Sequence, residues 1–343
     1  MLSRPLSYTI GRFAVKKTPS PANKPLSRLF QVCYKSTVSE NRRVVFFRHG
    51  QSTWNKQNIF IGMTDTPLTE EGVTEAIQGG QMLKNGNIDI DVVYTSLLRR
   101  STKTVWLALE EMGLEWVPVH KNYLLNERSY GALVGMNKKE CADKYGTELV
   151  RQWRRSWDTP PPPMDKESEH WPGKDHRYQR LGITDEMIPF SESLKMVTKR
   201  TSVFWDTVII PELHKKKTVM IVGHENNLRS IIKRLDDISD EDILHIELPR
   251  AIPLVYDLDP ITLKPVRSLN AAPGLSGRYL TDKERVEQIY QANLELVYGV
   301  EAAERMKKQS DKVCSKTLRE AADKQKEASG QSFVAESDNK FSI

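Results

Sequence analysis

The sequence predicts an α/β fold in which a mostly parallel central sheet is flanked by helices and carries a long active-site insertion. Short apolar runs, each the length of one buried strand, alternate along the chain with segments of helical spacing. Between residues 126 and 190 the chain instead holds several prolines, many charges and little regular pattern. A long loop of this kind inside a compact domain usually has a functional role.

The first half of the predicted fold contains three strands and two helices. A strand at residues 44–47 is followed by a turn-rich stretch. Thr69 is typical of a helix N-cap, because two glutamates follow it in the first turn. A strand at 91–96, a helix at 97–112 and a third strand at 116–119 complete this half.

The second half repeats the alternation after the insertion. We expect a helix at residues 193–210, a buried strand at 218–222, a helix at 228–235 and a last strand at 253–258. The predicted catalytic domain therefore covers residues 44–282.

Residues 283–343 are predicted to form a helix and then a solvated or disordered tail. Nine basic and eight acidic residues lie between positions 301 and 343, with few large apolar ones. A partner-binding helix is the alternative interpretation of this segment.

The net charge of +6 belongs to the N-terminal segment rather than to the whole chain. Residues 1–43 hold nine Lys or Arg and one acid, whereas the remaining residues hold 42 basic and 44 acidic side chains. This balance gives no reason to expect a nucleic-acid partner. The basic, Ser- and Thr-rich segment is typical of a transit peptide and predicts the mitochondrial matrix. A plastid is the alternative, or the cytoplasm if the segment is only a basic arm.

Several classes of protein are excluded by composition. No apolar run approaches the ~20 residues of a membrane span, so we expect no membrane partner. The three cysteines, Cys33, Cys141 and Cys314, form no closely spaced pair and predict neither a disulfide framework nor a zinc ribbon. No cluster with metal-ligand spacing is present, so no metal is expected.

Two histidines directly follow buried strands: His49 after residues 44–47, and His224 after residues 218–222 and Gly223. Ligands bind beyond the carboxyl ends of parallel strands, so neighbouring strands would bring both imidazoles into one crevice. Each histidine taken alone would more often be structural. Cations that suit phosphate or carboxylate oxygens lie in turns or at element ends, namely Arg48, Arg99, Arg100, Arg128, Lys138, Arg154 and Arg155. Such a site suits phosphoryl transfer through a phosphohistidine.

The segment RHGQSTWN at residues 48–55 resembles the signature of the histidine phosphatase superfamily, and more narrowly that of cofactor-dependent phosphoglycerate mutases. The similarity extends to about residue 288. The run from Asn126 to Leu133 and the pair Arg154-Arg155 resemble the mutase branch in particular.

The resemblance implies a role for each matching residue. His49 would be the nucleophile, Glu127 the proton shuttle, and Arg48, Arg100 and His224 would hold the transferred phosphoryl group. Residues in matching positions would bind the substrate and its second anionic group: Ser52, Asn55, Ile61, Gly62, Arg128, Tyr130, Lys138, Arg154, Arg155 and Asn226.

The implied reaction interconverts 3-phosphoglycerate and 2-phosphoglycerate, with 2,3-bisphosphoglycerate as the primer of the phosphohistidine. The partner is then a small phosphorylated three-carbon acid, and a homo-oligomer is compatible with the sequence. One alternative is a phosphatase or bisphosphoglycerate phosphatase of the same superfamily. Another is a catalytically weak regulatory or scaffold protein.

Three departures from the family pattern bear on these alternatives. The family usually has glycine at Glu225, Thr-Gly at Arg250-Ala251, and threonine at Ile61. A glutamate beside a phosphate repels it, and a position that needs an unusual φ would strain a non-glycine residue. We therefore expect Glu225 and Arg250 to pair. The departures indicate either tolerated drift or altered substrate choice or lost mutase activity.

Overall fold

The computed structural model describes residues 41–215 and 217–308. The predicted transit peptide lies outside these residues except for positions 41–43, and so does the predicted tail beyond residue 308. Both remain predictions. None of the helices in the described residues is long and apolar enough to cross a membrane.

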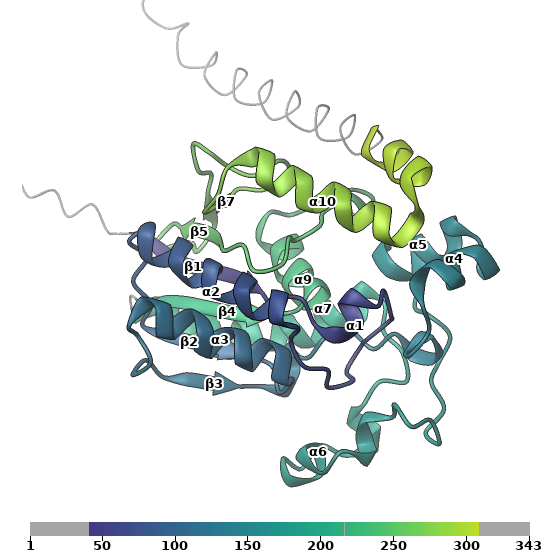
Figure 1. The fold of residues 1–343 in the computed structure, drawn as a ribbon. Coiled ribbons are helices and arrows are strands. Elements are labelled where there is room, and N and C mark those ends of the chain that lie inside the picture. The colour runs from purple at the N-terminus through teal and green to yellow at the C-terminus, as the bar shows by residue number, and fades with distance from the viewer. Residues whose placement is uncertain (1–40, 216, 309–343) are drawn as a thin grey trace, which may run out of the picture. The chain divides into compact units, whose positions relative to one another are not determined.

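The described chain forms a mixed seven-stranded sheet in the order β3-β2-β4-β1-β5-β6, with β7 paired to β5 (Figure 1). The strands β1 to β4 are parallel, and β5 to β7 are antiparallel additions. The predicted α/β class and the parallel centre of the sheet are therefore confirmed. The strand bounds are β1 Arg42–Arg48, β2 Val92–Thr95, β3 Val119–Lys121, β4 Thr218–Gly223, β5 Leu254–Leu258, β6 Pro265–Val266 and β7 Arg278–Tyr279.

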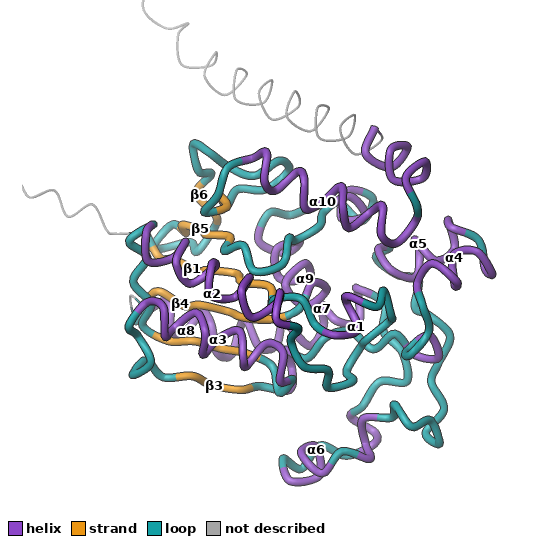
Figure 2. The backbone as a smooth tube through the Cα atoms, in the orientation of Figure 1, coloured by secondary structure: helices purple, strands orange, loops and turns teal. Residues whose placement is uncertain are grey.

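Helices cover both faces of the sheet (Figures 1 and 2). One face packs against α2 (Glu70–Asn85) and α3 (Arg99–Met112), and the other against α7 (Leu194–Phe204), α8 (Ile210–His214) and α9 (Glu225–Leu235). The N-cap predicted at Thr69 is confirmed, because its hydroxyl accepts a hydrogen bond from the Gly72 amide at 3.0 Å.

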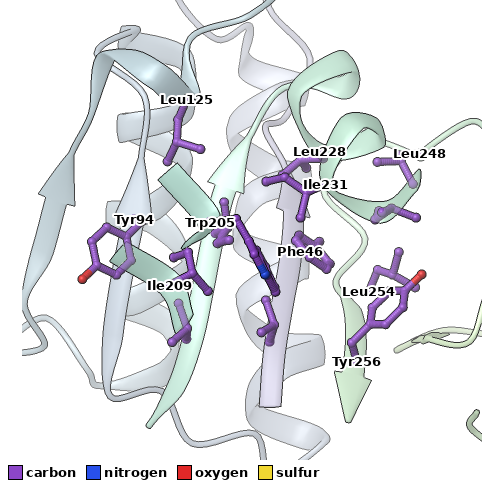
Figure 3. Close-up of a cluster of buried hydrophobic side chains, with 14 of the residues drawn as sticks. Phe46, Tyr94, Leu125, Trp205, Ile209, Leu228, Ile231, Leu248, Leu254 and Tyr256 are labelled. Carbon is purple, nitrogen blue, oxygen red and sulfur yellow. The ribbon is translucent and has the colours of Figure 1, made fainter. Parts of the chain in front are cut away.

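The larger apolar core lies between the sheet and α7 to α9 (Figure 3). Phe46 of β1 is at its centre, stacked on Trp205 at 6.5 Å between ring centroids and edge-on to Tyr256 at 5.5 Å. Alternate residues of the same strand, Val45 and Phe47, point to the opposite face and join the smaller core. The strand is buried on both faces, which explains its uninterrupted apolar sequence.

The insertion holds more regular structure than predicted. It contains α4 (Lys138–Tyr145), α5 (Thr147–Arg155) and α6 (His176–Arg180). These helices are only one to three turns long, so no extended periodic pattern marks them in the sequence. The remaining short elements are α1 Thr53–Lys56, the π-helical η6 Trp205–Ile209, and the 3₁₀ turns η2 Tyr123–Leu125, η3 Gly131–Leu133, η4 Pro172–Lys174, η5 Asp185–Met187 and η7 Asp242–His245.

Several element bounds differ from prediction. The helix predicted at residues 193–210 is α7, followed by η6 and by α8, which ends at His214. The third strand occupies residues 119–121 rather than 116–119, because Pro118 cannot donate to a neighbouring strand. Helix α9 begins at Glu225 rather than residue 228, immediately after its N-cap His224.

Helix α10 (Lys283–Tyr298) confirms the helix predicted beyond residue 282. Its N-cap Asp282 accepts a hydrogen bond from the Arg285 amide at 2.8 Å. The helix ends beside α5 (Figure 1), where the Arg154 guanidinium donates to the Tyr298 hydroxyl at 2.5 Å. Near this end, the Asn58 side chain donates to the Leu296 carbonyl at 2.9 Å. The C-terminal part of the helix therefore contacts α5 and the loop that follows α1.

Candidate active site

His49 and His224 lie at the ends of adjacent parallel strands. The register of β1 and β4 pairs Arg48 with Gly223, so each histidine is the next residue beyond the paired positions. Their ring centroids are 5.0 Å apart. The prediction that both imidazoles share one crevice is confirmed.

The hydrogen bonds of His49 define its tautomer. Its Nδ1 lies 2.6 Å from the Gly50 carbonyl and therefore donates, whereas its Nε2 accepts from the Arg100 Nε at 3.2 Å. Burial, followed by the charges of Arg100 and Arg48, lowers the pKa of His49 well below its usual value of 6.5. The imidazole is thus neutral at pH 7, with a lone pair on Nε2.

The turn after His49 requires glycine because the backbone approaches α2 closely. A Cβ at Gly50 would lie 2.2 Å from the Gly72 carbonyl oxygen, and one at Gly72 would lie 2.0 Å from the Gln51 carbonyl oxygen. The two glycines let the start of α2 pack closely against the loop, which fixes the direction of the chain beyond His49.

His224 is completely buried, and within the described residues one of its two ring nitrogens has a hydrogen-bond partner. Its Nε2 lies 2.8 Å from the Ser96 hydroxyl, while its Nδ1 has no hydrogen-bond partner within the described residues. Burial, then the charges of Arg100 and His49, lowers the pKa of His224 well below 6.5. A buried ring nitrogen without a partner is suited to a hydrogen bond with a bound oxyanion.

Two arginines flank His49. Arg100 is buried, and its terminal nitrogens donate to the carbonyls of Thr64 at 2.8 Å and Gly62 at 2.9 Å. Gly62 makes this possible with a left-handed φ of 56°. Burial lowers the pKa of Arg100 to about 10, so it stays charged at pH 7. Arg48 donates to the Leu248 carbonyl at 2.6 Å.

A cavity of about 60 Å³ lies against His49. Most of the residues predicted for the site line it, namely Arg48, His49, Asn55, Ile61, Gly62, Arg100, Glu127, Tyr130, Lys138, Arg154 and Arg155.

Three residues predicted to bind substrate, and His224, lie outside the cavity lining. Ser52 is the N-cap of α1 and accepts from the Asn55 amide at 3.3 Å. Arg128 donates to the carbonyls of Trp153 and Arg154, each at 2.8 Å. Asn226 donates to the Tyr130 hydroxyl at 3.1 Å. These side chains hold residues of the cavity wall in place instead of facing the cavity.

Glu127 is on a loop that other charged residues hold rigidly. Its own carboxylate accepts from the Arg128 amide at 2.7 Å. Arg200 donates to the Asn126 carbonyl at 2.8 Å and pairs with Glu192 at 2.8 Å. The only carboxyl group predicted to act in proton transfer is therefore fixed at the cavity wall.

A second group of cations lines the cavity on the side of the insertion. Lys138 begins α4 and Arg154 lies near the end of α5. Removal from water, followed by the charge of Arg154, lowers the pKa of Lys138 to about 7. The positive charge of this wall therefore changes near neutral pH.

The predicted pairing of Glu225 with Arg250 is wrong. Glu225 pairs instead with Arg155 at 2.6 Å and Arg48 at 3.2 Å, both within the cavity wall. Arg250 pairs with Glu75 at 3.3 Å and also donates to Asn293 at 2.9 Å. The nearer cations decide the pairing, because Coulomb attraction in a buried site falls with distance.

The backbone strain expected at Glu225 is absent. Glu225 is the first residue of α9 and adopts a helical conformation that any residue can take. Ala251, where the family usually has glycine, does have a left-handed φ of 51°. The left-handed φ that favours glycine therefore occurs at Ala251 and not at Glu225.

Residues 44–260 match the family model described as Histidine phosphatase superfamily (branch 1). The chain belongs to the histidine phosphatase superfamily. The superfamily assignment agrees with the two imidazoles and the flanking arginines at the strand ends.

Several solved structures resemble this superfamily member in fold. The α-ribazole phosphatase from Shigella flexneri is 21% identical, with 65% of this chain and 93% of that chain covered and a TM-score of 0.47. A mycobacterial glucosyl-3-phosphoglycerate phosphatase is 23% identical, with coverages of 63% and 92% and a TM-score of 0.47. YhfR from Bacillus stearothermophilus is 18% identical, with coverages of 65% and 93% and a TM-score of 0.49. At these identities the matches do not indicate the substrate of this superfamily member.

In this member of the superfamily, several cavity residues were not predicted as site residues. Asn293, Leu296 and Val297 come from α10 and follow the i, i+3, i+4 spacing of one helix face, which is the pattern that could have revealed them. No local pattern marks Asn58 or Glu247.

Proposed function

We propose that the protein is a phosphoglycerate mutase that interconverts 3-phosphoglycerate and 2-phosphoglycerate through a phosphohistidine on His49. The observation that supports this best is the placement of cations on two sides of one cavity. Arg48 and Arg100 flank His49, whereas Lys138 and Arg154 belong to the insertion. A substrate with a phosphate at one end and a carboxylate at the other suits this arrangement.

The primer of such a mutase, 2,3-bisphosphoglycerate, supplies the phosphoryl group that first charges His49. The residues present suit an anion of this kind, because the Nε atoms of Arg48 and Arg154, both in the cavity lining, are buried without hydrogen-bond partners in the described chain. Arg48, Arg100 and Asn55 would hold the phosphoryl group next to His49, and Lys138 and Arg154 the other end of the molecule.

In the proposed reaction, the lone pair on His49 Nε2 forms a bond to phosphorus while the bond from phosphorus to the leaving oxygen breaks. Glu127 gives that oxygen the proton that it took up from the attacking hydroxyl in the other half of the cycle. In the return step Glu127 accepts the proton of the attacking hydroxyl, whose oxygen forms a bond to phosphorus as the bond to Nε2 breaks. Arg100 and Arg48 stabilise the charge that develops on the phosphoryl oxygens.

One observation favours a phosphatase as a second candidate. Arg155, which the resemblance assigns to substrate binding, is engaged by both Glu225 and Glu247. A site with fewer free cations would hold a phosphorylated acid less firmly after the first transfer, and water could then attack the phosphohistidine.

The deciding experiment incubates the full-length protein with 3-phosphoglycerate, with and without 2,3-bisphosphoglycerate. Formation of 2-phosphoglycerate that depends on the primer supports the mutase. Release of inorganic phosphate without 2-phosphoglycerate supports the phosphatase. Neither product from a folded protein supports a catalytically weak regulatory or scaffold role.

A further inference from the structure

Glu225 places a carboxylate within the anion site of this protein. One of its oxygens lies 2.6 Å from Arg155 and the other 3.2 Å from Arg48. The side chain is 9% exposed, and the two guanidiniums are 5% and 10% exposed. The three groups form a desolvated ion cluster that lines the same cavity as His49.

We propose that Glu225 is a specificity-determining residue that weakens the binding of bisphosphorylated ligands relative to monophosphorylated ones. Its carboxylate occupies the position between Arg48 and Arg155, where a second phosphate would gain most from two guanidiniums. The proposal rests on the proposed function, since it concerns the primer and the substrate of the same site.

Arg155 has little charge left for a ligand. Besides Glu225, it contacts the carboxylate of Glu247, which also lines the cavity. Burial alone would lower the pKa of Arg155, but the two carboxylates raise it well above its usual value. The cation is therefore held by the protein itself, and a ligand must compete with two fixed anions to use it.

Glu225 stays ionised in this setting. Burial would raise its pKa, but Arg155 and then Arg48 lower it well below the usual value for a glutamate. The residue cannot move far, because its backbone starts α9 directly after His224. A ligand that approaches Arg155 therefore meets a fixed negative charge.

The remaining cations suit one singly charged group. Lys138 and Arg154 also line the cavity, and the pKa of Lys138 is about 7. A carboxylate carries one negative charge, whereas a phosphate monoester carries nearly two at pH 7. The second phosphate therefore suffers more from Glu225 than a carboxylate does, and the primer must be supplied at a higher concentration than a site without Glu225 would need.

Binding measured without turnover tests the proposal. Calorimetry on the His49→Ala protein, which cannot be phosphorylated at that residue, gives Kd for 2,3-bisphosphoglycerate and for 3-phosphoglycerate. We expect the bisphosphate to bind no more than about threefold tighter than the monophosphate. A bisphosphate that binds tenfold tighter or more would overturn the proposal without any further variant.

The same measurement is then made with Glu225→Gly and Glu225→Gln added to His49→Ala. We expect Kd for the bisphosphate to fall at least tenfold, and Kd for the monophosphate to change less than threefold. Glu140→Gln is the matched control, because it removes one carboxylate from the exposed side of α4 and should alter neither value. Equal changes for both ligands, or no change, would refute the role of Glu225.

These outcomes are separate from the test of the proposed function. A protein that forms no 2-phosphoglycerate but gains bisphosphate affinity in Glu225→Gly refutes the mutase and supports the selectivity. A protein that has mutase activity, and whose affinity for the bisphosphate is the same with and without Glu225, supports the mutase and refutes the selectivity.

Discussion

The rings of His49 and His224 lie 5.0 Å apart at an interplanar angle of 63°, and the pKa of each is held well below 6.5. Both rings are buried next to Arg100, whose charge opposes a second positive charge on either of them. The pair is therefore neutral over the physiological pH range, which leaves the Nε2 lone pair of His49 available for attack on phosphorus.

Replacement of the nucleophile gives the first prediction. His49→Ala should abolish acid-labile phosphate on the protein after incubation with 2,3-bisphosphoglycerate, because His49 is the histidine that lines the described cavity beside Arg100. Labelled primer and autoradiography measure this. His176→Ala, at an exposed histidine of α6, should label normally. A label that persists in His49→Ala would disprove the assignment.

Glu127→Gln should lower turnover by about 10²- to 10⁴-fold, the usual contribution of a general acid–base group. The amide keeps the size of the side chain and can still accept from the Arg128 amide, so the unfolding temperature should change little. Steady-state kinetics and thermal unfolding measure the two effects. Glu115→Gln, at an exposed position, is the control. Turnover within threefold of wild type would remove Glu127 from the mechanism.

The lowered pKa of Lys138 predicts that substrate binding depends on pH. With a pKa of about 7, it is mostly charged at about pH 6 and mostly neutral at about pH 8, so KM for 3-phosphoglycerate should rise as pH increases. A bound anion favours the charged form, which moves the midpoint somewhat above 7.

Lys138→Met should raise KM at about pH 6 and flatten this part of the profile. Lys139→Met is a matched control, because Lys139 is the sequence neighbour of Lys138, is exposed, and pairs with Asp143 at 2.8 Å. An unchanged slope in Lys138→Met would mean that another group titrates.

Tyr298→Phe tests the contribution of α10. The phenylalanine keeps the ring, whose centroid lies 5.1 Å from the Arg154 guanidinium, and removes only the hydroxyl that accepts from Arg154. A hydrogen bond to a charged group contributes about 1.5–3 kcal/mol, so KM should rise by roughly tenfold or more if the bond orients Arg154 toward substrate. Tyr145→Phe is the control, at a more exposed tyrosine of α4. Equal KM values in both variants would show that Arg154 needs no support from α10.

The basic N-terminal segment gives a prediction that concerns location. Residues 1–43 fused to a fluorescent reporter should direct it to mitochondria, because the segment is basic, rich in hydroxyl residues and free of acids before Glu40. Microscopy with a mitochondrial marker measures this. Replacement of Arg4, Arg12, Lys16 and Lys17 by glutamine should abolish import, and a cytosolic wild-type fusion would refute the proposal.

Features of the fold that depend on a few neighbouring residues could be predicted from the sequence. Uninterrupted apolar runs identified β1 and β4, and Thr69 marked the start of α2, because burial and capping act over a few residues. The pairing of Glu225 could not be predicted, since Arg48 and Arg155 reach it from distant parts of the chain. For the same reason, sequence similarity alone did not distinguish residues such as Arg128 and Asn226 from those that face the cavity.

The cavity draws on residues from Arg48 to Val297, and its last contribution comes from α10, which is synthesised after all strands of the sheet. A chain still emerging from the ribosome can form β1 and expose His49 before the wall that orients Arg154 exists. The same applies to a product cut near residue 282, which would keep the sheet and lose the support of α10. Synthesis of α10 is thus a condition for assembly of the whole cavity wall.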